Sequence, residues 1–160
     1  MLDGAKLQEV QHERNLGVEV SSSLKPSLQR TKAAAKAMQV LGIIKRNFVM
    51  NEDFRLLFNG YVKPHLEYCV QVWSPYLKKD RECLEKVQRR ATKLVKGLKN
   101  KPYPERLALL HTSSLVKRRL RGDLIQVYRI MSGIDKVNME HFIELEHGGG
   151  HDLRGHRFKV

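Results

Sequence analysis

The sequence predicts a mainly α-helical fold: a small bundle of about five helices preceded by one short N-terminal strand. Apolar residues recur at helical spacing in several segments, helix-starting and helix-ending residues flank these segments, and strand-like alternation occurs once. The chain has 160 residues, of which 41% are hydrophobic, so it is long enough to bury one core. We therefore expect an N-terminal remnant with the strand at 1–24, a helical domain at 25–133, and a partly disordered C-terminal extension at 134–160.

The first half of the chain predicts the strand and three helices. Residues 16–20 (LGVEV) form a short β-type run. Residues 26–46 are rich in helix formers and begin with Pro26, which the first turn of a helix tolerates. We expect Asn51 to cap the next helix, and Pro64 to break that helix and start another.

The second half predicts three further helical segments. Asp80 is expected to cap a helix over the following residues, RECLEKVQRRATKLVK, which Gly97 ends. A short helical turn follows at PERLALL, and a long helix over residues 114–132 ends at Gly133. We expect Trp73 to be at least half buried. The apolar residues predicted to be buried in the two long helices are Leu84, Val87, Leu94, Leu120, Leu124 and Val127.

Positive charge dominates the sequence and is concentrated in the predicted helices. Thirty Lys and Arg against seventeen Asp and Glu give a net charge of +13. Residues 25–46 carry six Lys or Arg and no acid, and residues 78–101 carry ten against three acids. Because such a surface attracts polyanions, nucleic acid is the leading partner class.

Two basic clusters are candidate sites. The helix after Asp80 carries an arc of cations opposite its apolar face, and this arc is either an ordinary solvated face or a phosphate contact; the lack of acids on it favours phosphate. Its members are Lys86, Arg89, Arg90, Lys93 and Lys96. For residues 117–121 (KRRLR), with Arg118, Arg119 and Arg121, three interpretations stay open: nuclear import, nucleic-acid contact or plain surface.

Other functional classes find little support in the sequence. Cys69 and Cys83 make no disulfide framework, which indicates an intracellular location in the nucleus or cytoplasm, and no apolar stretch is long enough for a membrane span. His147, His151 and His156 suggest zinc, but no cysteine or carboxylate cluster completes a site. Because nucleotide-binding and hydrolase motifs are also missing, we expect no metal, no cofactor and no catalytic residue.

One long stretch is specific enough to suggest a family. Residues 65–98, HLEYCVQVWSPYLKKDRECLEKVQRRATKLVKGL, resemble the region directly C-terminal to the polymerase core in reverse transcriptases of LINE-type, jockey-like non-LTR retrotransposons. The pieces LGVEVSSSLKP, KAAAKAMQVLGIIKRNF and RRLRGDLIQVYRIMSG resemble the same proteins in the same order. The resemblance covers about residues 16–133.

The resemblance implies a thumb and the helical segment beyond it, which in this RNA-directed DNA polymerase family grip the template–primer duplex. By this reading the matched cations face nucleic acid: Lys86, Arg89, Arg90, Lys93, Arg118, Arg119 and Arg121. The family's fingers and palm, with the paired aspartates that bind catalytic metal ions, should precede LGVEV, and only fifteen residues do. Polymerase activity therefore does not carry over to this chain.

Three functional hypotheses follow. The first is a truncated transposable-element product that binds RNA or DNA, duplex or hybrid, with low sequence specificity and is not an enzyme. The alternative is a protein-interaction or structural module whose partner occupies the surface left by the missing palm. This alternative would be favoured by an exposed apolar patch that is larger than the patches found on ordinary monomeric proteins. The third is a translated pseudogene without a selected role.

Overall fold

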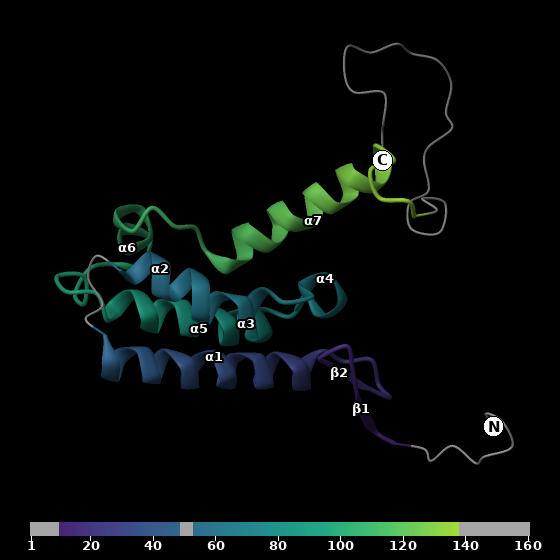
Figure 1. Ribbon diagram of the computed structural model, residues 1–160, viewed down its shortest axis with the longest axis horizontal. Helices are drawn as coiled ribbons and strands as arrows, with labels where there is room; N and C mark the ends of the chain where they lie inside the picture. Colours follow the sequence, from purple (N-terminus) through teal and green to yellow (C-terminus); the bar gives the residue numbers. More distant parts are fainter. Residues whose placement is uncertain (1–9, 49–52, 138–160) are drawn as a thin grey trace, which may run out of the picture. The chain divides into compact units, whose positions relative to one another are not determined.

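The computed structural model describes residues 10–48 and 53–137, and its elements are labelled in Figure 1. The elements are β1 (His12–Asn15), β2 (Val18–Ser21), α1 (Ser27–Asn47), α2 (Phe54–Leu57), a π-helix (Phe58–Val62), α3 (Lys63–Glu67), α4 (Val70–Trp73), α5 (Lys78–Lys93), α6 (Tyr103–Leu109) and α7 (Leu115–Met131). The predicted fold class, a small and mainly helical bundle with N-terminal β structure, is confirmed. The predicted helix cap at Asn51 lies outside the described residues.

The N-terminal β structure is a hairpin and not a single strand. β1 pairs with β2 in antiparallel register, with Asn15 opposite Val18. The turn between them holds Leu16 at φ 47° and Gly17 at φ 83°, the positive values that a tight two-residue hairpin turn requires. β1 was not predicted because its residues (HERN) are all polar and exposed, which gives no alternation to detect.

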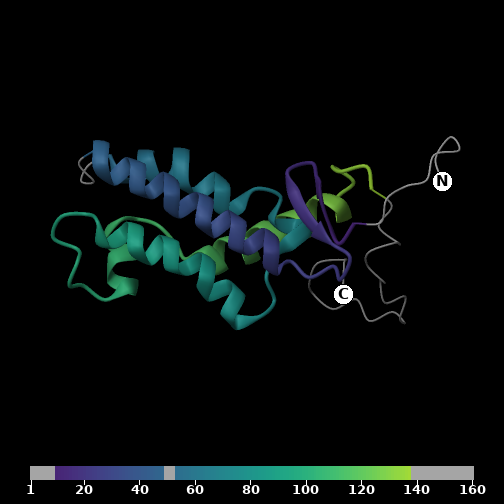
Figure 2. The ribbon, with the colours of Figure 1, turned by 90° about the horizontal axis from the view of Figure 1, so that it is seen from below.

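α1 is the central element of the first part of the bundle. It packs against α5, α3 and the π-helix, and Figures 1 and 2 both show α1 and α5 side by side. The small buried side chains of Ala33, Ala34 and Ala37 allow this close approach, and Leu41 and Ile44 continue the buried face. The other large side chains of the core include Phe54, Phe58, Val62, Leu66, Trp73, Leu84, Val87 and Leu115.

The helical path does not break at Pro64, contrary to expectation. α2, the π-helix and α3 follow one another without interruption, and Pro64 lies in the first turn of α3. Proline cannot donate a backbone hydrogen bond and clashes with the preceding turn. The wider hydrogen-bond spacing of the π-helix directly before it accommodates both defects. The chain turns later, where Tyr68 is extended and Cys69 has φ 51°.

Asp80 does not cap α5, so this prediction is wrong. α5 begins earlier, at Lys78, with Leu77 at the cap position and no side-chain cap bond. Asp80 lies in the first turn, where an acidic side chain is favoured, and it is buried. Its carboxylate forms an ion pair with Arg30 of α1, so it joins the two helices instead of closing the helix end.

Burial of the predicted core residues before α6 agrees with the sequence pattern. Leu84 and Val87 are fully buried, and Leu94 is partly buried against the core. Trp73 is buried as well, and its Nε1 donates a hydrogen bond of 2.8 Å to the carbonyl oxygen of Tyr68. Tyr76, three residues further on, is exposed.

The chain divides into two compact units after Leu120, inside α7. α7 ends as predicted: Gly133 has φ 68°, and the Ile134 amide bonds the carbonyl of Arg129, which closes the helix end. The predicted burial of its apolar face is wrong. The exposed fractions of Leu120, Leu124 and Val127 are 60%, 63% and 37%. Helical spacing identifies an apolar face, but it does not show whether another element covers that face.

Candidate nucleic-acid interface

α5 has a buried apolar face and an exposed cationic face. Lys86, Arg89, Arg90 and Lys93 are all exposed. Their positions i, i+3, i+4 and i+7 place them on one side of the helix. Among the described residues, none of the four forms an ion pair. The structure therefore brings four of the predicted site residues together as one uncompensated surface, which we call the α5 basic face.

A buried carboxylate holds the neighbouring elements against α5. Glu85 accepts hydrogen bonds from the Tyr103 hydroxyl of α6 and from the Leu115 amide, at 3.4 Å, at the start of α7. Burial and the bond to Glu85 together raise the pKa of the Tyr103 phenol well above its ordinary value of 10.0. One acidic side chain thus joins three helices behind the α5 basic face.

The side chain of Arg89 is oriented by an aromatic ring. Its guanidinium lies 4.9 Å from the ring centroid of Tyr103, and the buried Arg106 lies on the same ring at 5.4 Å. Arg106 Nη1 also donates a hydrogen bond of 2.9 Å to the backbone oxygen of Arg89. These contacts orient the Arg89 side chain and attach this turn of α5 to α6, which lowers the cost of ordering Arg89 on binding.

The second predicted cluster is largely structural. Arg118 binds the carboxylate of Glu67 through two nitrogens, at 2.7 and 3.1 Å, and this hydrogen bonding raises the pKa of Arg118. Arg119 is only 5% exposed, and its Nη2 donates to the backbone oxygen of Leu66 at 3.3 Å. Both arginines fasten the start of α7 to α3. The partner of Arg118 is 51 residues away, which no local pattern reveals.

The remaining two predicted cations are not part of the α5 basic face as defined above. Lys96 is exposed but follows the last residue of α5, and it has interactions of its own. Arg121 is exposed in the second unit. We therefore build the candidate interface on Lys86, Arg89, Arg90 and Lys93.

The cations of α1 are less free than their acid-free segment suggests. Arg30 pairs with Asp80 of α5, and Lys32 Nζ lies 2.7 Å from the carboxylate of Glu19 in β2. Acids from other segments therefore neutralise two of the five Lys and Arg charges of α1, which local charge counting could not predict.

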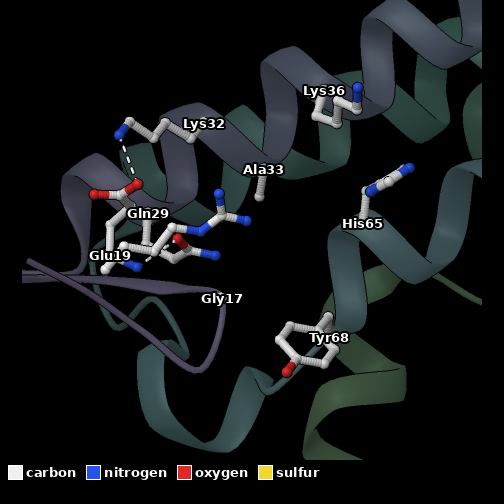
Figure 3. A pocket seen from close by; sticks show the side chains of 9 residues that line it. Gly17, Glu19, Gln29, Lys32, Ala33, Lys36, His65 and Tyr68 are labelled. Carbon is white, nitrogen blue, oxygen red and sulfur yellow. Dashed lines mark hydrogen bonds and ion pairs between the residues drawn. The ribbon is translucent and has the colours of Figure 1, made fainter.

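A pocket of about 680 Å³ opens between the hairpin, α1 and α3 (Figure 3). Its polar lining is Arg14 and Glu19 from the hairpin, Gln29, Lys32 and Lys36 from α1, and His65 from α3. The Tyr68 ring completes a wall, and its hydroxyl donates a hydrogen bond of 2.9 Å to the Leu16 carbonyl. Sequence analysis missed this pocket because its residues come from three separate elements.

Within residues 10–48 and 53–137, no group of three or more His, Cys, Asp or Glu side chains is arranged to hold a metal ion. The three histidines considered for zinc, His147, His151 and His156, lie outside these ranges. No helix in the described part of the chain is long and apolar enough to cross a membrane.

Comparison with protein-family models, with curated proteins and with solved structures gave no match to this chain.

Proposed function

We propose that this chain is a non-catalytic nucleic-acid-binding module that grips duplex or RNA–DNA hybrid of the template–primer type. The observation that carries the proposal is the α5 basic face, whose four exposed cations form no ion pair within residues 10–48 and 53–137. One of them, Arg89, is oriented by Tyr103. The resemblance of residues 16–133 to the thumb region of LINE-type reverse transcriptases favours the same ligand.

The dimensions of the α5 basic face suit a phosphate backbone. At about 1.5 Å per residue, the seven steps from Lys86 to Lys93 span roughly 10 Å. Successive phosphates of one strand rise about 3.4 Å along the duplex axis, so the face covers roughly three of them. Lys and Arg at this spacing neutralise phosphates and read no base edges. Binding with low sequence specificity follows.

The salt dependence of binding tests the proposal. Each cation that neutralises a phosphate releases counterions, with a slope of about −0.9 per contact in log K against log salt. Replacing Lys86, Arg89, Arg90 and Lys93 by Gln is therefore expected to flatten the slope by roughly three units. Fluorescence anisotropy of a labelled hybrid between 50 and 300 mM salt measures it, while circular dichroism checks that helicity is kept.

A matched control separates this face from general charge. Gln at Lys25, Lys45, Arg46 and Lys136, all exposed, removes the same formal charge from other places. We expect this variant to keep most of the slope. If both variants lose affinity equally, the charge of the whole chain is responsible and the α5 basic face is not the site; if neither loses affinity, the chain does not bind nucleic acid through these groups.

A second candidate function is the binding of a protein helix on α7. The observation in its favour is the exposure of Leu120, Leu124 and Tyr128, which follow one another at intervals of four residues. α7 carries five Lys or Arg and one Asp, so a second copy of this helix would be repelled and a partner with flanking acids is favoured.

A designed peptide tests this candidate. An amphipathic helix with Leu on one face and Glu beside it is expected to bind the full chain, and Lys at Leu120 and Leu124 should abolish that binding. Equal binding by the variant would exclude α7 as the docking surface.

A further inference from the structure

The pocket between the hairpin, α1 and α3 holds more positive charge than its own acid neutralises. Glu19 is the one acid of its lining, and Lys32 occupies the Glu19 carboxylate at 2.7 Å. Among the described residues, neither Arg14 nor Lys36 forms an ion pair. Arg14 lies opposite Glu19 in the hairpin register, and the lining as a whole carries three permanent positive charges against one negative charge, an excess of two.

Two cross-links hold the hairpin against the helices and shape the pocket. The Gln29 side-chain oxygen accepts a hydrogen bond of 2.9 Å from the Glu19 amide, which ties β2 to α1. The bond from the Tyr68 hydroxyl to Leu16 ties the hairpin turn to the end of α3. The pocket is thus formed before a ligand arrives, and binding needs little rearrangement.

The polar groups are distributed on both sides of the cavity. In Figure 3, Glu19, Gln29 and Lys32 stand along one side, and Lys36, His65 and Tyr68 along the other. Because Lys32 is already paired with Glu19, the groups left to bind a ligand are Arg14, Lys36 and His65. These groups supply a guanidinium fork, a point charge and an imidazole N–H, all of which donate hydrogen bonds to phosphate oxygens.

We infer that this pocket binds a dianionic phosphate monoester, the group carried by a phosphorylated nucleic-acid end and by a free nucleotide. The excess of two positive charges in the lining matches a dianion, whereas a phosphodiester within a strand carries one charge. A cavity of about 680 Å³ also has the size of ordinary small-molecule sites. The inference stands apart from the α5 basic face, because a free nucleotide needs none of that face.

The side chain of His65 provides a direct readout of the pocket. The full chain, titrated at pH 7.5 with adenosine 5′-monophosphate, is expected to show saturable shifts of the His65 imidazole signals in NMR spectra. Cyclic 3′,5′-adenosine monophosphate, a phosphodiester of similar size, should bind about tenfold more weakly because it lacks one charge. Failure of the monophosphate to shift His65, or equal binding of the diester, would overturn the inference.

Variants locate the effect. Gln at Arg14 and Lys36 should abolish the shifts, while Gln at Lys45 and Arg46, exposed on the same helix, removes the same charge and should leave them unchanged. Equal loss in both variants would show that general charge is responsible and no site exists. Gln substitution of the α5 basic face should not alter the titration, so failure of that face and failure of the pocket are distinguishable.

Oligonucleotides with a 5′-phosphate or a 5′-hydroxyl distinguish the two sources of the ligand. Equal affinity of the nucleotide, the 5′-phosphorylated strand and the 5′-hydroxyl strand, each dependent on Arg14 and Lys36, would contradict a monoester site. If the 5′-phosphorylated strand binds more tightly than the 5′-hydroxyl strand, a strand end is a ligand of the pocket. If the nucleotide binds as tightly as the phosphorylated strand, the phosphate group alone is sufficient for binding.

Discussion

At the scale of single residues, Tyr103 is a partly buried acid whose ionisation opposes the folded state. Its phenol pKa is raised by burial first and by the hydrogen bond to Glu85 second. A raised pKa contributes stability that is fully present below the unfolded value of 10.0. That stability is lost as the pH rises above this value, because the unfolded chain then releases the proton that the folded chain keeps.

We therefore predict that Tyr103 ionises only when the chain unfolds. The Tyr103 contribution to tyrosinate absorbance at high pH, obtained as the difference between the parent chain and Tyr103→Phe, should appear only together with the loss of helicity. Urea unfolding at pH 8 and above pH 10 should show a smaller alkaline loss of stability in Tyr103→Phe than in the parent chain. Ionisation of Tyr103 before the loss of helicity would contradict the hydrogen bond to Glu85.

Arg90 and Arg118 test whether an arginine that already forms an ion pair also contributes to nucleic-acid binding. Arg90 is exposed and has no acidic partner in the described part of the chain, whereas the guanidinium of Arg118 already binds Glu67. We predict that Arg90→Gln lowers the salt slope of nucleic-acid binding by about 0.9, and that Arg118→Gln leaves it nearly unchanged. Because the Arg118 pair is partly exposed, its loss should cost only about 0.5 kcal/mol of unfolding free energy. If Arg118→Gln lowers the salt slope as much as Arg90→Gln does, Arg118 contacts the nucleic acid as well.

At the scale of elements, α5 and α7 show that the same apolar spacing leads to different burial. Leu84 in α5 is fully buried, and Leu124 in α7 is 63% exposed. We predict that Leu84→Ala costs about 2–5 kcal/mol of unfolding free energy. Leu124→Ala should cost less than about 0.5 kcal/mol. Urea unfolding measures both, and a cost for Leu124→Ala close to that of Leu84→Ala would show that α7 is buried in solution.

Local signals were sufficient to predict most helix positions. Periodicity and the glycine at position 133 predicted α5, α6 and α7 with their ends within a few residues. Contacts between distant segments could not be predicted in this way. β1 has no apolar pattern. Asp80 was predicted to cap a helix but pairs with Arg30, and Arg119 was predicted to be a surface cation but is buried. In each case the outcome depends on a partner that is distant in sequence.

The candidate site divides along the same line. The cations of α5 share one helix, so their common face follows from spacing alone. The pocket of Arg14, Lys36 and His65 requires the hairpin, α1 and α3 to come together, and that arrangement depends on the cross-links from Gln29 and Tyr68. Sequence analysis could therefore predict a basic helix face but not a basic pocket.

At the scale of the whole molecule, a net charge of +13 attracts polyanions and at the same time lowers the stability of the free chain. Like charges repel one another in a compact chain, and the repulsion is greatest where they are closest. Lys86, Arg90 and Lys93 lie within roughly 10 Å along one helix, which is about the screening length at 0.1 M salt. They have no acidic partners among the described residues, so their proximity lowers stability without any compensating ion pair.

We predict that Gln at these three positions weakens nucleic-acid binding and at the same time stabilises the free chain at low salt. Arg89 stays unchanged in this variant, because its contact with the Tyr103 ring contributes to stability on its own. The gain in unfolding free energy should be about 0.5–1 kcal/mol at 20 mM salt. It should disappear at 300 mM salt, where the charges of the parent chain are screened as well. Gln at Lys25, Lys45 and Lys136 removes the same formal charge from dispersed positions and should stabilise the chain less. Charges that serve ligand binding are expected to lower the stability of the free chain. If their removal instead lowers the unfolding free energy at both salt concentrations, these three cations have a structural role.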